Sequence, residues 1–139
     1  DKLIVREGGA REPHISTSSS HGKLEMDGAG VFLFTLNTVP VCINELLEKS
    51  NLDVKDIDLF IFHQASQLVI ENIIRIMSLN KEKVFVNLKD TGNTVSATIP
   101  VALKDAENQG RLISGDRIML VGFGVGLSWG ATIMTWTDT

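Results

Sequence analysis

Three polar or glycine-rich stretches of the sequence each follow an apolar segment and together could bind a reactive oxygen. His63-Gln64 comes directly after a short apolar run, Asn93 lies between Gly92 and Thr94, and residues 122–126 alternate glycine with apolar residues. An imidazole, a carboxamide and free backbone N–H groups are hydrogen-bond donors that can stabilise a carbonyl oxygen as it becomes negative. These residue types therefore predict an oxyanion-binding pocket, provided that the fold brings the three stretches together.

The segments between these stretches have the periodicity of alternating helices and strands. We expect a short strand at 2–5, helices over 37–49, 66–77 and 95–109, and strands over 56–62, 84–88, 117–121 and 131–136. Strands that alternate with helices favour a mostly parallel sheet covered on both faces. Ligands bind beyond the carboxyl ends of the strands in such sheets, which is where the three stretches fall. The last two strands are joined by only a few residues, 124–128, and should be antiparallel neighbours.

Each stretch also has a purely structural interpretation. A histidine after a buried strand is more often a structural group than a catalyst. Gly-Asn before a helix is most often a turn with a cap, and glycines between antiparallel strands are typical of hairpins. Taken singly, each structural interpretation is the more common one, but convergence on one sheet edge gives a functional interpretation about equal weight.

Composition and charge exclude several classes of function. The chain has 139 residues, with 13 Lys+Arg against 17 Asp+Glu, a net charge of −4 and no basic cluster, so we expect no nucleic-acid partner. No apolar run approaches the ~18 residues of a membrane span, so we expect no membrane segment. His14, His21 and His63 lack the spacing of metal ligands, and no metal site is expected.

Cysteine usage points to a reducing compartment. The single cysteine, Cys42, cannot form an internal disulfide, which favours a cytoplasmic setting. Cys42 lies on the apolar stripe of the helix expected at 37–49, where a cysteine is usually a small core residue rather than a nucleophile.

Longer motifs surround the candidate donors and stand in one order along the chain. They are Phe62-His63-Gln64-Ala65, Gly92 to Pro100 and Val121 to Ala131, with Gly8 to Arg11 and Met26-Asp27-Gly28 upstream. Together they closely resemble the C-terminal half of 3-oxoacyl-(acyl-carrier-protein) synthase III, a family of the thiolase-like superfamily. Because three motifs match at the correct relative positions, the resemblance is specific.

The resemblance implies a fold class, an α/β thiolase-like half. Residues 1–139 would be the C-terminal domain of such a synthase, with the N-terminal half absent. The half would have three layers, α/β/α, around a mixed sheet whose last strand is antiparallel. Residues 1–30 would form a loop-rich segment and residues 31–139 the α/β core. The strand at 131–136 would normally pair with a strand that this chain lacks, which leaves an exposed edge.

The resemblance also implies an activity, that of an acyltransferase and condensing enzyme of fatty acid biosynthesis. Family members perform a decarboxylative Claisen condensation of an acyl-CoA primer with malonyl carried on acyl carrier protein. A cysteine in the N-terminal half accepts the primer, and no cofactor beyond the two substrates is implied. The implied partners are acyl carrier protein, acyl-CoA, the missing N-terminal half and, in the full enzyme, a second copy in a homodimer.

Residue roles follow position by position from the same resemblance. His63 and Asn93 would hold the malonyl thioester oxygen while decarboxylation generates an enolate. The backbone N–H of Val125 would complete the oxyanion hole around the acyl-cysteine carbonyl. The positions that would contact the substrate or its pantetheine arm are Gln64, Ser66 and Gly28.

Two positions depart from the family pattern and leave alternatives open. Ser66 stands where the family typically has Asn, and Leu68 stands where some members carry an Arg that docks the carrier protein. One alternative is a related acyltransferase or condensing enzyme of secondary metabolism, and another is a non-catalytic half-domain that serves as an interaction module. Because Cys42 lies on the wrong element to be the nucleophile, we expect this chain alone to be inactive in condensation.

Overall fold

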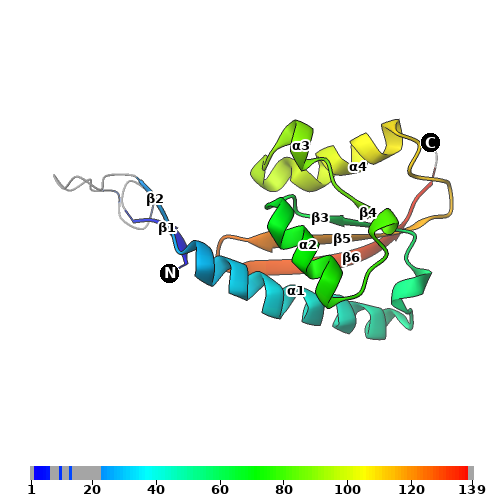
Figure 1. Ribbon diagram of the computed structural model, residues 1–139, viewed down its shortest axis with the longest axis horizontal. Coiled ribbons are helices and arrows are strands. Elements are labelled where there is room, and N and C mark those ends of the chain that lie inside the picture. The colour runs from blue at the N-terminus through cyan, green and yellow to red at the C-terminus, as the bar shows by residue number, and fades with distance from the viewer. Residues whose placement is uncertain (1, 7–9, 11–12, 14–22, 138–139) are drawn as a thin grey trace.

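A mixed sheet with helices on both faces forms the body of the molecule (Figure 1). The computed structural model describes residues 2–6, 10, 13 and 23–137. The four strands of this sheet stand in the order β4 (Val84–Phe85), β3 (Leu59–Phe62), β5 (Arg117–Gly124) and β6 (Ser128–Thr135). β3 runs parallel to both β4 and β5, and β6 is antiparallel to β5. The predicted mixed sheet and its antiparallel last strand are therefore confirmed.

The two faces of β3 belong to two separate hydrophobic cores. Phe60 and Phe62 pack with α1 (Gly28–Ser50) and α2 (Gln67–Ile76), whereas Leu59 and Ile61 pack with α4 (Thr98–Asn108). This follows from the alternation of side chains along a strand. All four side chains are at most 2% exposed, and burying each one stabilises the fold by about 1.5–3 kcal/mol. One core on each face of the sheet gives the three-layer α/β/α arrangement that we expected.

The helices α2 and α4 begin in different ways. Ser66, the first residue of the helix expected at 66–77, caps α2, since its hydroxyl accepts a hydrogen bond from the N–H of Val69 at 3.3 Å. The helix expected at 95–109 is shorter than predicted. A 3₁₀ turn at Val95–Ala97 precedes α4, which spans Thr98–Asn108.

The strands of the main sheet differ in their bounds from the predicted ones: β3 and β4 are shorter, β5 is longer and β6 is shifted towards the N-terminus. β3 begins at Leu59 because Val54–Asp56 form a 3₁₀ turn, closed by the reciprocal capping of Asp53 and Asp56. β4 ends at Phe85 because the short helix α3 (Leu88–Thr91) follows it, and the 3₁₀ turn Lys81–Lys83 precedes it. β5 continues to Gly124, and β6 begins at Ser128 and ends at Thr135, so the connection between them is shorter than expected.

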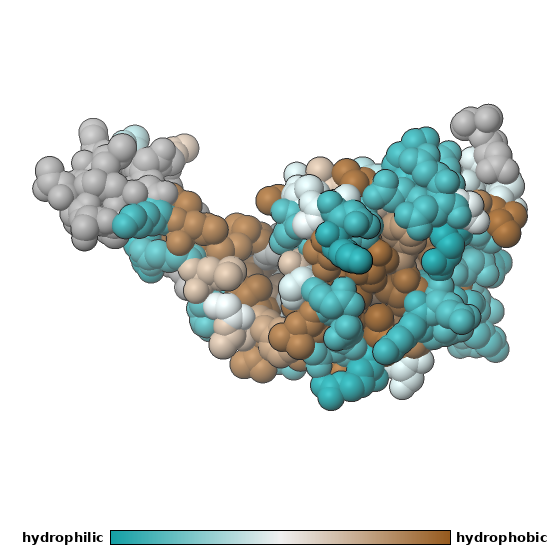
Figure 2. All heavy atoms as spheres, turned by 45° about the horizontal axis from the view of Figure 1, so that its top comes forward, coloured by the Kyte–Doolittle hydropathy of each residue, from teal (hydrophilic) through white to brown (hydrophobic). Residues whose placement is uncertain are grey.

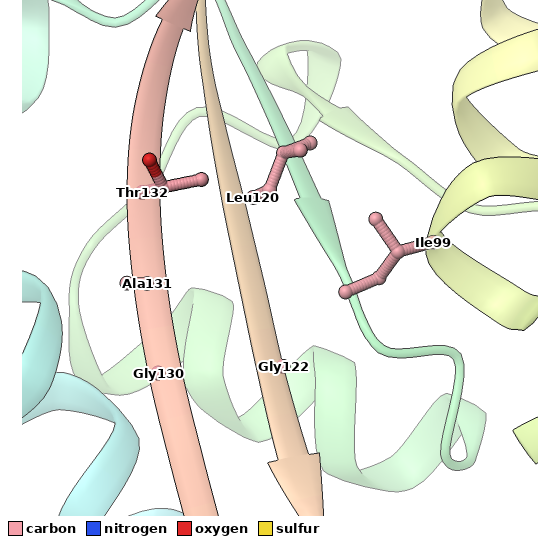
Figure 3. Close-up of a pocket in the computed structure, with 6 residues that line it drawn as sticks. All are labelled: Ile99, Leu120, Gly122, Gly130, Ala131 and Thr132. Carbon is pink, nitrogen blue, oxygen red and sulfur yellow. The ribbon is translucent and has the colours of Figure 1, made fainter. Parts of the chain in front are cut away.

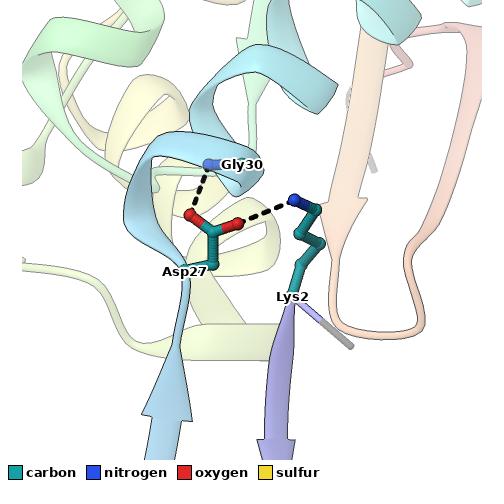
Figure 4. A network of polar contacts seen from close by, with 3 residues as sticks. All are labelled: Lys2, Asp27 and Gly30. Atoms are coloured by element: carbon teal, nitrogen blue, oxygen red, sulfur yellow. Dashed lines mark hydrogen bonds and ion pairs between the residues drawn. The ribbon is translucent and has the colours of Figure 1, made fainter.

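The helix expected at 37–49 begins much earlier, at Gly28. The carboxylate of Asp27 accepts a hydrogen bond from the N–H of Gly30 at 2.8 Å and is held by Lys2 at 2.7 Å (Figure 4). This cap starts the helix at Gly28. The sequence did not reveal this start, because residues 31–36 are apolar except for Thr35 and therefore show no helical alternation of polar and apolar side chains. Pro40 lies inside the helix, although proline is more often found in a first turn.

α1 is also long and apolar enough to cross a membrane by length and composition alone, whereas the apolar runs of the sequence led us to expect no membrane segment. Its inward side chains pack against α2, β5 and β6, and Val39 and Ile43 are fully buried. A core helix satisfies the same criterion of length and apolarity. One side of α1 therefore packs on the sheet and on α2, and 22% of its apolar window is buried.

A two-stranded ribbon extends from the start of α1, away from the main sheet (Figure 1). It pairs β1 (Leu3–Val5) with β2 (Leu24–Met26), and an Arg6–Glu25 ion pair at 2.8 Å joins the strands. The short strand expected at 2–5 is thus found. Figure 2 shows apolar surface where the ribbon meets the body of the molecule. Most of the Gly8–Arg11 motif, and also His14 and His21, lie outside the described residues.

Candidate functional site

The loops that follow β3 and β4 bring His63 and Asn93 to the same edge of the sheet. The N–H of His63 donates to Val121 O at 2.7 Å, which continues the β3–β5 pairing by one residue and fixes the histidine backbone. The side-chain Nδ2 of Asn93 lies 3.4 Å from Ala65 O, two residues beyond His63. Two of the three predicted stretches are therefore in contact at the carboxyl ends of the parallel strands.

The imidazole of His63 is half-buried between two side chains that fix its orientation. Its Nδ1 lies 2.6 Å from the hydroxyl oxygen of Thr98, and its ring meets the ring of Phe123 edge-on, with centroids 5.3 Å apart. Burial lowers the pKa of His63 below its usual value, since the charged imidazolium loses hydration there. The ring is therefore neutral at neutral pH, with one nitrogen able to donate.

The amide of Asn93 is oriented by the backbone that follows it. Its Oδ1 accepts a hydrogen bond from the N–H of Val95 at 2.9 Å. Because the oxygen is occupied, the Nδ2 group is the part of the exposed side chain available to a ligand. The amide thus adds a second donor close to the histidine.

Gln64 is fully buried and joins the ends of two strands. Its Nε2 donates to Phe62 O at 2.8 Å and lies 3.5 Å from Phe85 O, while its Oε1 accepts from the N–H of Asn87 at 3.2 Å. Gln64, the residue after His63, therefore ties the end of β3 to the end of β4. Its contact with the substrate stays a prediction.

The third stretch reaches the site through Phe123, the ring that contacts His63. Val125 lies in the connection between β5 and β6 and is 60% exposed, and its carbonyl accepts a hydrogen bond from the Ser128 hydroxyl at 2.7 Å. None of the described contacts joins Val125 to His63 or Asn93. Its N–H as an oxyanion donor stays a prediction.

The remaining predicted contact residues are occupied by the fold or lie elsewhere. The hydroxyl of Ser66 is taken up by the α2 cap, and Gly28 is the first residue of α1, beside the exposed Lys2–Asp27 pair (Figure 4). The hydrogen bond from Lys2 and the one from the Gly30 N–H lower the pKa of Asp27. Neither Ser66 nor Gly28 has a described contact with His63 or Asn93.

An open apolar hollow of about 340 Å³ lies on the α4 face of the sheet (Figure 3). Ile99 of α4 and Leu120 of β5 point towards each other across it, and β6 forms its far wall with residues 130–132. Ile99 directly follows Thr98, the partner of His63. The lining is mostly apolar, and Thr132 is the only residue among the six with a polar side chain, so the hollow is better suited to an apolar group than to a charged one.

Cys42 and the other potential ligands do not add to this site. Cys42 is partly buried on α1, and burial raises the pKa of its thiol, with a smaller contribution from Glu45. A raised pKa keeps the group as a thiol, in line with the structural interpretation. Within the part of the chain that the structure describes, no group of three or more His, Cys, Asp or Glu side chains is placed to hold a metal ion.

Sequence reasoning missed Thr98 as a member of the site. It lies at the start of α4, is only 2% exposed and stands 35 residues from His63. The signal in the sequence was a small polar residue at the start of a helix, which is common and does not reveal a contact with a distant histidine.

Comparison with known proteins identifies a family for this chain. The model of the family described as 3-oxoacyl-[acyl-carrier-protein (ACP)] synthase III C terminal matches residues 47–136. A beta-ketoacyl-[acyl-carrier-protein] synthase III of Rhodopirellula baltica is 38% identical over 139 residues, which cover 98% of this chain and 40% of that protein. One from Prochlorococcus marinus is 42% identical over 113 residues, covering 81% of this chain and 33% of that protein.

A solved structure of a protein with the same description has a similar fold over almost the whole of this chain. The crystal structure of a beta-ketoacyl-[acyl carrier protein] synthase III from Thermus thermophilus superposes with a TM-score of 0.86 at 36% identity, covering 99% of this chain and 42% of that one. The chain thus spans well under half the length of these relatives, and the similarity concerns one part of a larger protein.

Proposed function

The chain belongs to the family of 3-oxoacyl-[acyl-carrier-protein] synthase III C-terminal domains, and from this premise we propose that it is the C-terminal catalytic half of a condensing enzyme. The reaction would be the decarboxylative Claisen condensation of an acyl-CoA primer with malonyl on acyl carrier protein, in fatty acid biosynthesis. The nucleophilic cysteine that carries the primer would lie on a segment outside this chain.

The observation that supports this proposal is the convergence of two donors from different loops. His63 presents a neutral imidazole and Asn93 presents the Nδ2 end of its amide, because the oxygen end is bonded to Val95. A malonyl thioester oxygen placed between them would accept two hydrogen bonds. Both bonds strengthen as decarboxylation moves negative charge onto that oxygen, so the pair binds the transition state more tightly than the substrate.

The remaining parts of the proposal rest on the family. The N–H of Val125 would face the carbonyl of the acylated cysteine, and Gln64, Ser66 and Gly28 would support or contact the pantetheine arm. Acyl carrier protein, acyl-CoA, the N-terminal half and a second copy of the protein would be the partners, in a cytoplasmic setting. Leu68 is 60% exposed on α2, so a carrier protein docking there would meet an apolar side chain.

His63→Ala and Asn93→Ala in a full-length protein containing this chain test the proposal. Each variant should decarboxylate a malonyl thioester roughly 10²–10³ times more slowly, because each loses one oxyanion donor. Acylation of the cysteine by acyl-CoA should change far less, since it does not need these two donors.

Asn72→Ala is the matched control, since Asn72 lies on α2 and its side chain bonds only residues of the same helix, donating to Leu68 O at 2.8 Å and accepting from Arg75 at 2.5 Å. It should keep the wild-type rate. If His63→Ala and Asn93→Ala also keep that rate, the chain is a non-catalytic interaction module and the proposal is refuted.

A further inference from the structure

The hydroxyl of Thr98 has one proton and two neighbours that could accept it. His63 Nδ1 lies 2.6 Å from Thr98 Oγ1, and Val95 O lies 3.0 Å from it. Where this proton goes decides which nitrogen of His63 carries the ring hydrogen, because a neutral imidazole has one donor and one acceptor nitrogen.

The surroundings of the two acceptors are different. Val95 O already accepts the backbone N–H of Thr98, so it is satisfied without the hydroxyl. The contact with His63 Nδ1 is the shorter of the two, and Thr98 is the only partner that the described contacts give to this nitrogen. If the hydroxyl donated to Val95 O, Nδ1 would have to carry the ring hydrogen and donate to the hydroxyl oxygen. The shorter contact with Nδ1, and the partner that Val95 O already has, favour the hydroxyl donating to the ring.

We propose that Thr98 is a positioning residue whose hydroxyl donates to Nδ1 of His63 and thereby keeps the ring hydrogen on Nε2. The hydrogen bond itself does not depend on the proposed function, but its catalytic role does: Nε2–H is the donor that an enolate oxygen needs. If Nδ1 instead donated to Thr98, Nε2 would present a lone pair to that oxygen and would repel it.

The backbone of one residue, Val95, links both donors of the site. Val95 donates its N–H to Asn93 Oδ1, and its carbonyl bonds to Thr98, the partner of His63. Val95 has a φ of 57°, a left-handed conformation that is unfavourable for a β-branched residue, while its own side chain is 70% exposed. The left-handed conformation therefore directs the backbone groups of Val95 and not its side chain: the N–H orients Asn93, and the carbonyl bonds to Thr98.

Burial of the ring agrees with this arrangement. It lowers the pKa of His63, so the neutral ring with its single hydrogen is the form that Thr98 acts upon at neutral pH. Thr98 is itself 2% exposed, so water has little access to compete for its hydroxyl.

The test is the position of the ring hydrogen, measured by ¹⁵N NMR of His63 in the full-length protein. The wild type and Thr98→Ser should both show hydrogen on Nε2, because both have the hydroxyl. Thr98→Val keeps the shape of the side chain but has no donor, so Nδ1–H should become populated. Hydrogen on Nδ1 in the wild type, or a Thr98→Val spectrum like that of the wild type, would overturn the proposal.

Kinetics give a second measurement of the same role. Thr98→Val should lower kcat for malonyl thioester decarboxylation by roughly ten-fold or more, short of the loss from removing an oxyanion donor, with little change in KM. Thr98→Ser should restore most of the rate. An unchanged kcat in Thr98→Val, where His63→Ala is slow, would refute the role.

The two proposals fail in distinguishable ways. If the condensing function is wrong, His63→Ala has no kinetic effect, yet the ring hydrogen still follows the hydroxyl at position 98. If Thr98→Val does not fold, the wild-type and Thr98→Ser spectra still decide where the hydrogen lies.

Discussion

Replacing Gln64 by Leu should destabilise the protein strongly, although the change makes a buried residue more apolar. Leucine has a similar volume, so the substitution opens little space. It removes the side-chain partners of two buried groups, the N–H of Asn87 and the carbonyl of Phe62. The residues that carry these groups are 6% and 0% exposed, so water cannot replace the lost partners.

The size of the effect follows from the number of groups left without a partner. Each buried donor or acceptor that loses its hydrogen bond costs about 1–3 kcal/mol. Two such groups give about 2–6 kcal/mol, while the contact at 3.5 Å with Phe85 O is too long to add much. Total stabilities of domains are about 5–15 kcal/mol, so the loss is a large fraction of the whole.

Urea unfolding measures this loss, with Gln67→Leu as the matched control. Gln67 is exposed at the start of α2 and bonds only Glu71, at 2.9 Å, so its replacement should change the free energy of unfolding by no more than about 0.5 kcal/mol. If Gln64→Leu unfolds within about 0.5 kcal/mol of Gln67→Leu, the bridge between β3 and β4 does not hold the two strand ends together.

Gln64→Glu adds a test that depends on pH. The new carboxyl can still accept from the Asn87 N–H, but its second oxygen faces Phe62 O and must be protonated to donate. Burial and the nearby carbonyls raise its pKa in the folded state above the ~4.3 of an unfolded chain. The variant should therefore be most stable below about pH 4 relative to the wild type and lose stability as pH rises through the folded-state pKa. A stability difference independent of pH would contradict this reasoning.

Two further predictions concern the ionisation of His63 and the activity of this chain by itself. The midpoint of the NMR titration of His63 should lie below 6.5, and a midpoint at or above 6.5 would contradict the effect of burial. Because the unfolded state then binds the proton more tightly than the folded state, protonation of His63 should destabilise the fold as pH falls from about 6.5 through the folded-state pKa. The 139-residue chain alone, mixed with acyl-CoA and a malonyl thioester, should yield no 3-oxoacyl product, because Cys42 is a partly buried thiol on α1; product formation would show that the chain contains its own nucleophile.

The sequence was informative wherever a pattern depends on neighbouring residues. The apolar runs around 57–62 and 117–121 predicted strands because alternate residues must be buried on two faces. The helix expected at 66–77 was also found close to its predicted place, because the donor to its cap Ser66, the N–H of Val69, is only three residues away. The start of α1 was wrong for the opposite reason. Its cap depends on Asp27 and on Lys2, 25 residues earlier, and no local pattern records that pairing.

For the candidate site, the sequence by itself determined which chemical groups are present: an imidazole, a carboxamide and a glycine-rich connection after three strands, in the order of a known family. Only the tertiary structure decided how those groups are held. The contact of His63 with Thr98 and the bridge from Gln64 to Asn87 join residues 35 and 23 positions apart. Such contacts form when parallel strands bring their carboxyl ends to one edge, and the separation along the chain is then set by the helices that connect those strands.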